Sequence, residues 1–138
     1  MEFDIKPYVG AGKILLGMTS EKIREVIAEE PDKFKKFNED EYDSDMFKAF
    51  FAYYKKPGVC NAIEFYGEAN ITLNGKIMLG IPYADIQAMF EEIDDSLELD
   101  DAGLTSLKYG VGIYASGAKK NPLDPVESVI VFEKGYYD

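Results

Sequence analysis

Two stretches of the chain carry apolar residues at the three- and four-residue spacing of a helix that buries one face. In the first stretch Ile23, Val26 and Ile27 form the stripe, and the hydroxyl of Thr19 is placed to cap the helix start. In the second stretch apolar residues recur at positions 86, 89, 90 and 93, behind Pro82, whose fixed φ suits a helix start. The pattern predicts two amphipathic helices whose stripes lie in the core.

The other apolar runs are short and are separated by turn residues, which is typical of strands. Residues 47–54 and 59–66 predict an aromatic hairpin, and Asn74-Gly75 is the strongest turn signal in the chain. Residues 105–114 alternate strictly and predict one continuous strand with one buried face. Residues 126–133 would then return as the second strand of another hairpin. The acidic stretch from 38 to 45 is expected to be a loop or a frayed helical turn.

An internal match organises these elements. Residues 12–23 and 75–86, at an offset of 63 positions (75 − 12), share six identities over twelve positions, and each segment is followed by a helix, a polar gap and a hairpin. The sequence therefore predicts an α+β fold of two β-α-β-β repeats, about 1–67 and about 68–138. Because a tight turn joins the copies, we expect them to share one antiparallel sheet, with both helices on one face and the other face partly open.

Composition narrows the choice of partners. With 138 residues, 46% of them hydrophobic, the chain is expected to form a single domain with a real core. Asp and Glu number 26 against 15 Lys and Arg, a net charge of -11, which repels nucleic acid and anionic lipid and attracts a basic protein. A general role of this acidity in solubility is the alternative. No apolar run approaches the roughly 20 residues of a membrane span, and no secretion signal is recognisable, so a cytoplasmic protein is expected.

The amino-acid composition excludes most catalytic mechanisms. The chain has no His, which removes the commonest general base and the usual nucleophile partners, and its one cysteine, Cys60, is expected to be a buried hydrophobe on a strand. The calcium-loop spacing fails in both acidic runs, where Tyr42 and Leu99 stand at required positions. No phosphate-binding glycine motif is present. We expect a protein that is not an enzyme and has neither a metal nor a cofactor.

Tyrosine usage is the most informative feature of the composition. Ten Tyr occur without any Trp, and a Tyr ring combines an apolar body with a polar tip, as interfaces prefer. The alternative is that these rings lie at sheet margins with their hydroxyls in water. If the Tyr residues and the acidic loops form a binding surface, the candidate partner contacts are Glu39, Asp40, Glu41, Asp43, Asp45, Tyr54, Asp100, Asp101 and Tyr114.

The segment from Gly12 to Ile23 resembles the junction between strand and helix in tandem-repeat inhibitor folds. These include the family of the β-lactamase inhibitory protein and the related small lipoprotein of the outer-membrane barrel-assembly machine. It also resembles small acidic bacterial proteins associated with toxin-immunity loci. The resemblance covers about a dozen residues per copy and implies a non-catalytic protein-binding scaffold. It transfers no functional residues to this chain.

Together these observations favour a binding module, for example an immunity or inhibitor protein that neutralises a basic toxin of the nuclease type by covering its active site. Carboxylates would then mimic phosphates. Two alternatives stay open: a small ligand-binding domain or hydrolase that works through carboxylates and Tyr, and a housekeeping protein without a toxin partner. A deep pocket with two adjacent acids would favour the former, whereas a flat or open sheet face would favour the binding module. The sequence does not indicate an oligomeric state.

Overall fold

The computed structural model describes residues 1–35 and 42–137. Its elements are β1 (Glu2–Lys6), β2 (Gly10–Ala11), β3 (Ile14–Leu15), α1 (Ser20–Ile27), β4 (Asp32–Phe34), β5 (Ser44–Met46), β6 (Phe50–Lys55), β7 (Val59–Tyr66), β8 (Asn70–Leu73), β9 (Lys76–Ile77), α2 (Tyr83–Ile93), β10 (Glu98–Asp100), β11 (Gly103–Ser106), β12 (Val111–Tyr114) and β13 (Ser128–Phe132). The α+β class predicted from the sequence is confirmed.

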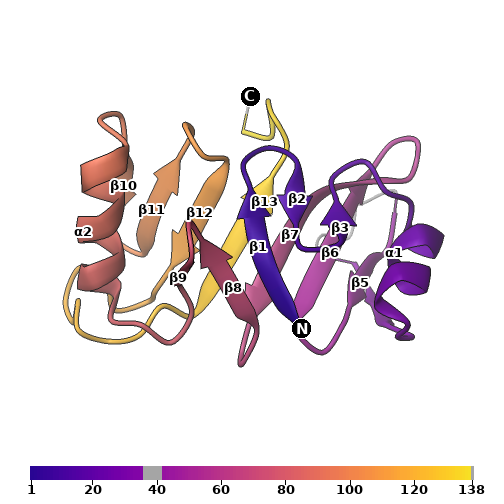
Figure 1. The fold of residues 1–138 in the computed structure, drawn as a ribbon, viewed down its shortest axis with the longest axis horizontal. Coiled ribbons are helices and arrows are strands. Elements are labelled where there is room, and N and C mark those ends of the chain that lie inside the picture. The colour runs from indigo at the N-terminus through magenta and orange to yellow at the C-terminus, as the bar shows by residue number, and fades with distance from the viewer. Residues whose placement is uncertain (36–41, 138) are drawn as a thin grey trace.

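The strands form two sheets, so the prediction of one shared sheet is wrong. A five-stranded sheet has the order β3-β2-β1-β8-β9, and an eight-stranded sheet has the order β10-β11-β12-β13-β7-β6-β5-β4 (Figure 1). The Asn74-Gly75 turn joins β8 to β9 inside the smaller sheet, where β1 and β8 run parallel. In the larger sheet the antiparallel pair β7 and β13 joins two four-stranded meanders. The physical reason is that β8 pairs with the start of the chain and not with β7.

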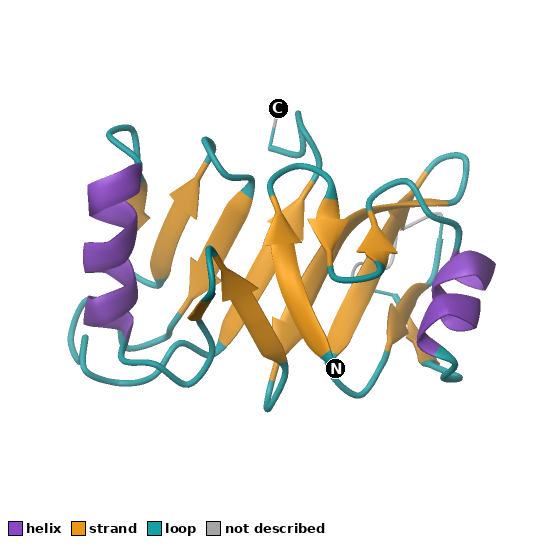
Figure 2. Cartoon of the chain, viewed as in Figure 1, coloured by secondary structure: helices purple, strands orange, loops and turns teal. Residues whose placement is uncertain are grey.

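One face of the eight-stranded sheet is covered by a full layer, and the other carries only a smaller aromatic cluster around Tyr53 and Phe132. Helix α2 lies beyond β9 and helix α1 beyond β3, and together with the five-stranded sheet they form a single layer over the larger sheet (Figure 2). The buried core between the layers draws on both, for example Phe3 and Ile71 from the smaller sheet and Phe65 and Val129 from the larger. The described residues place no helix on the opposite side, which we call the open face.

Both predicted helices are confirmed, including their starts. Thr19 caps α1, and its Oγ1 accepts a hydrogen bond of 3.2 Å from the backbone N–H of Lys22. Pro82 precedes α2, where its missing N–H leaves no donor unsatisfied. Ile23 of α1 is fully buried, and Phe90 of α2 is likewise buried in the core. The stripes therefore bury the faces that their spacing predicts.

The two matching segments make corresponding backbone bonds. Gly17 donates its N–H to the carbonyl of Cys60 at the start of β7, and the aligned Gly80 donates to Val126, just before β13. Gly17 and Gly80 have φ values of 96° and 77°, a region that L side chains avoid, which explains why both copies need glycine there. The sequence match thus follows from two equivalent turns that lead into the helices.

The hairpins are predicted better than the individual strand ends. The β6–β7 hairpin and the Asn74-Gly75 turn are both observed, the latter with positive φ at both residues. The continuous strand predicted over 105–114 is wrong, because the chain turns at residues 107–110, with Gly110 at φ 68°, and forms the separate strands β11 and β12. The acidic stretch 38–45, predicted as a loop or a frayed helical turn, ends in β5, which pairs with β6.

Cys60 has the predicted structural role. Its side chain is buried on β7, and burial raises the pKa of the thiol to about 12. The thiolate that nucleophilic chemistry needs is therefore scarce at neutral pH. None of the described helices combines the length and the apolar character that crossing a bilayer requires.

Candidate functional site

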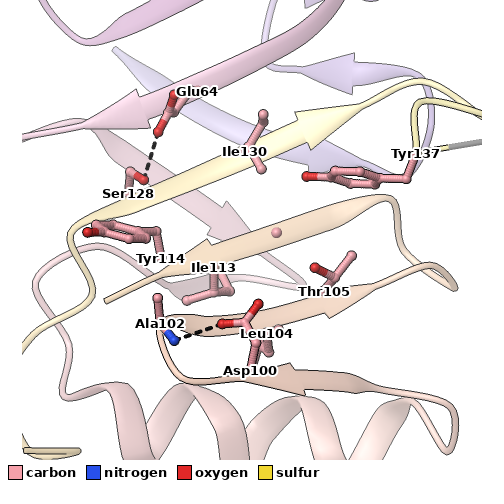
Figure 3. A pocket seen from close by; sticks show the side chains of 11 residues that line it. Glu64, Asp100, Ala102, Leu104, Thr105, Ile113, Tyr114, Ser128, Ile130 and Tyr137 are labelled. Carbon is pink, nitrogen blue, oxygen red and sulfur yellow. Dashed lines mark hydrogen bonds between the residues drawn. The ribbon is translucent and has the colours of Figure 1, made fainter. Parts of the chain in front are cut away.

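The open face carries a hollow, which we call the sheet hollow, over β10 to β13 and β7 (Figure 3). Its volume is about 170 Å³, below the roughly 300–1,000 Å³ of typical small-molecule pockets. It is lined by Glu64, Asp100, Ala102, Leu104, Thr105, Gly112, Ile113, Tyr114, Ser128, Ile130 and Tyr137. The size suits one inserted side chain better than a drug-sized ligand.

Strand alternation explains why polar residues face this hollow. On β13, Val129 and Val131 point into the core, so Ser128 and Ile130 point to the open face. On β7 the same alternation brings Glu64 to the open face, where it is directly opposite Ile130 in the register. The one charged residue of β7 is thereby placed near the centre of the larger sheet.

Glu64 is held by two hydroxyl groups. Its Oε1 accepts a hydrogen bond of 2.6 Å from Tyr53 Oη, and its Oε2 accepts one of 2.9 Å from Ser128 Oγ. Burial, followed by the hydrogen bond and charge of Glu64, raises the pKa of the Tyr53 phenol, so this donor keeps its proton. None of the ion pairs among the described residues involves Glu64. The orientation of the Glu64 carboxylate is therefore fixed by hydrogen bonds, while none of the described cations neutralises its charge.

Two phenols lie on opposite sides of the sheet hollow, as Figure 3 shows for Tyr114 and Tyr137. Their side chains are 47% and 59% exposed, large values for aromatic rings. Tyr137 follows β13 and packs edge-on against Phe132 with 5.0 Å between ring centroids. Burial, together with the charges of Glu64 and Asp100, raises the pKa of Tyr137. These rings offer apolar area next to carboxylates.

Between the two phenols the bottom of the sheet hollow is formed by a glycine. Gly112 is buried on β12 opposite Ile130, and an added Cβ would lie 2.7 Å from Ile130 Cγ2. Any larger residue would therefore displace Ile130 and fill part of the sheet hollow. The glycine therefore leaves the hollow open.

Two of the predicted contact residues line this hollow. Asp100 is exposed on β10, and its Oδ1 accepts a hydrogen bond of 2.7 Å from the N–H of Ala102 (Figure 3). Tyr114 lies on β12 across the hollow from it. Asp101, the next predicted residue, forms an exposed ion pair of 3.5 Å with Lys119 and does not line the hollow. The structure thus brings Asp100 and Tyr114 together and leaves Asp101 beside them.

The remaining predicted contact residues lie in the other half of the larger sheet or are not among the residues that the structure describes. Glu39, Asp40 and Glu41 lie outside the described residues. Asp43 is exposed and is 3.2 Å from Lys35 Nζ. Asp45 on β5 is fully buried, and Tyr54 donates a hydrogen bond of 2.7 Å to its Oδ2. Asp45 and Tyr54 are therefore engaged with each other, at a distance along the sheet order from the sheet hollow.

Asp45 has partners of both kinds, hydroxyls and cations. Ser20 Oγ donates to Oδ2 at 2.6 Å, and Arg24 and Lys33 each place a nitrogen 3.4 Å from Oδ1. Burial by itself raises the pKa of Asp45, but the hydrogen bonds from Ser20 and Tyr54 and the two positive charges outweigh it, so the pKa lies below its ordinary value. This carboxylate links α1 to β4 and β5 at the edge of the larger sheet.

Sequence reasoning missed Glu64, Ser128 and Tyr137. A signal for Glu64 was available, since it is the one charged residue within the apolar run from Val59 to Tyr66. No comparable signal marks Ser128, because its place beside Glu64 depends on the register of β7 against β13. In chemical terms the hollow can accept hydrogen bonds and positive charge. Among the residues that the structure describes, no group of three or more Cys, Asp or Glu could hold a metal ion.

Comparison with known proteins adds no identity to this geometry. No protein-family description, curated protein or solved structure matches the chain.

Proposed function

We propose that this chain is a non-catalytic protein-binding module that grips a basic partner with the open face of its larger sheet. In its most specific form, the proposal is that the chain is an immunity or inhibitor protein that covers the active site of a basic toxin of the nuclease type. The observation that carries the proposal is the sheet hollow, where Glu64 forms no ion pair with any described residue and two exposed phenols lie beside it.

Three properties of the hollow support binding of a protein over binding of a small molecule. Its volume of about 170 Å³ is small. Exposed Tyr rings such as Tyr114 are typical centres of protein interfaces. The lining residues include Glu64 and Asp100 but no Lys or Arg, and the whole chain carries a net charge of -11. A basic surface would be both attracted from a distance and matched on contact.

The first experiment immobilises the full chain and captures basic proteins at low ionic strength. A Tyr114→Ala variant should weaken retention of the specific partner about 30-fold, the loss of about 2 kcal/mol expected for an interface hot spot. Ile77→Ala is the matched control, since Ile77 is also exposed but lies on β9 of the smaller sheet. Equal retention by the wild type and Tyr114→Ala would refute a role for the open face.

The second experiment tests the toxin form of the proposal. If the gene next to the one for this chain encodes a basic toxin, co-expression of the chain should restore growth, and the Tyr114→Ala variant should restore less. Association of the two purified proteins should slow as salt is raised, because the attraction between them is screened. A partner that binds with salt-independent kinetics, or toxicity that co-expression does not relieve, would count against this form.

The proposal also includes an internal duplication, with copies of about 1–67 and about 68–138. Its support is the pair of equivalent backbone hydrogen bonds that Gly17 and Gly80 donate ahead of the two helices. If the halves arose by duplication, both contribute to the site, since Glu64 belongs to the first copy. Residues lining the sheet hollow come mainly from β10 to β13.

A further inference from the structure

We infer that the sheet hollow receives one arginine side chain of the partner. Its guanidinium would donate hydrogen bonds to Glu64 and stack against the phenol rings. This inference rests on the proposed function and names the chemistry that the open face recognises. It depends on the free acceptor capacity of Glu64, the rings on either side of it and the absence of a competing cation among the residues lining the hollow.

Glu64 is prepared to accept further hydrogen bonds. An ionised carboxylate offers about four acceptor positions, and the hydroxyls of Tyr53 and Ser128 occupy two of them, one on each oxygen. The positions left over suit the parallel N–H pair of a guanidinium. Because the two hydroxyls already fix the rotamer, little side-chain entropy remains to be lost on binding.

The aromatic rings favour arginine over lysine. A guanidinium is planar, stacks on aromatic faces and is more weakly hydrated than an ammonium, so it enters a partly dry hollow at lower cost. Tyr114 and Tyr137 border the hollow from two sides, and Ile130 of β13 lines it as well (Figure 3). Asp100 adds a second carboxylate at the β10 side, where its Oδ1 accepts a hydrogen bond from the backbone N–H of Ala102.

The hollow beside α1 is larger but does not suit such a side chain. The hollow beside α1 is lined by Arg24, Lys33 and Lys35, and the nearby carboxylates already pair with these cations. An arriving cation would therefore be repelled there or would have to break existing ion pairs. Glu64 differs from these carboxylates, because it lies in a ring-bordered hollow and takes part in no ion pair among the described residues.

The test uses the full chain labelled with ¹⁵N and titrated with Nα-acetyl-arginine amide at low ionic strength. We expect binding on the order of 10 mM, as for a single side chain, with shift changes concentrated on the amides of Glu64, Gly112 and Ser128. The uncharged analogue Nα-acetyl-citrulline amide should bind at least about fivefold more weakly, because it lacks the charge. Nα-acetyl-lysine amide should also bind more weakly, since it cannot stack as a plane.

Two variants make the result specific. Glu64→Gln and Tyr114→Ala should each weaken arginine binding at least about fivefold, whereas Glu91→Gln, on the exposed side of α2, should leave it unchanged. The second variant keeps the test valid if the first does not fold. Changes spread evenly over the acidic surface, equal binding of citrulline or lysine, or an unchanged Glu64→Gln titration would each overturn the inference.

The outcomes separate this inference from the proposed function. If arginine does not bind but Tyr114→Ala still releases the partner in the capture experiment, the arginine inference fails and the binding module stands. If arginine binds the sheet hollow but no basic protein is captured by the open face, the proposed function fails and the chemistry of the hollow stands.

Discussion

Strand β6 presents two consecutive tyrosines to two different carboxylates. Tyr54 packs against the main core and donates to Asp45 at 2.7 Å, whereas Tyr53 belongs to the aromatic cluster of the open face and donates to Glu64 at 2.6 Å. In each case a serine supplies a second hydroxyl to the same carboxylate. The two sites are therefore alike in their hydrogen-bond donors.

They differ in what neutralises the charge. Arg24 and Lys33 both lie 3.4 Å from Asp45, which is fully buried, while Glu64 is only partly buried and has no ion pair among the described residues. A buried charge is costly unless it is paired, so the cations of Asp45 are a condition of its burial. Glu64 does not need such a cation to the same degree, because it is only partly buried.

The comparison suggests how to separate structural from functional acids in a chain with 26 of them. An acid whose hydrogen bonds and charge are both satisfied within the chain stabilises the fold. An acid that is oriented by hydroxyls but lacks a cation is available for binding. Variants at Asp45 and Glu64 should therefore fail in different assays.

The largest expected effect is at Asp45. Asp45→Ala should lower the free energy of unfolding by about 3 kcal/mol, because it leaves Arg24 and Lys33 without their shared anion and the Tyr54 hydroxyl without its acceptor. Urea denaturation measures the loss. The control is Asp43→Ala, which breaks a half-exposed ion pair with Lys35 and should cost about 0.5 kcal/mol or less. Equal losses in the two variants would contradict the structural role of Asp45.

The next largest effect is a dependence of the free energy of unfolding on pH. Because the pKa of Asp45 is lower in the folded chain than its ordinary value of 3.8, its contribution to stability is complete above that value. It is lost as the pH falls through the folded-state pKa, when the unfolded chain already binds the proton. The free energy of unfolding should thus fall more steeply below about pH 4 in the wild type than in Asp45→Asn. Parallel curves from urea titrations at several pH values would exclude this linkage.

Local features of the fold were predictable because their causes lie within a few residues. The Thr19 cap, the Asn74-Gly75 turn and the stripe of α2 each depend on side-chain spacing or backbone φ alone. The break between β11 and β12 was missed because alternation continues through the turn, and only the positive φ of Gly110 reveals it. The second sheet was missed because it requires β1 to pair with β8, far along the chain.

The candidate site divides in the same way. Asp100 and Tyr114 were predicted from residue type and a predicted turn or strand, and both line the sheet hollow. Glu64 was not predicted, because its neighbours Tyr53 and Ser128 come from two other strands. They meet Glu64 only through the register of the larger sheet. Asp45 was chosen for its place in an acidic stretch, but its burial depends on α1, which supplies Ser20 and Arg24.

The smallest effect on stability is expected where the effect on binding is large. Glu64→Gln should change the free energy of unfolding by less than about 1 kcal/mol, since the amide keeps an acceptor oxygen and the variant removes a charge that has no cation. Partner affinity should fall at least about tenfold, because the arriving cation loses its counter-ion. Urea denaturation and binding of the purified partner measure the two quantities on the same sample. A loss of stability as large as that of Asp45→Ala, with binding unchanged, would make Glu64 a second structural acid and remove the distinction between the two faces.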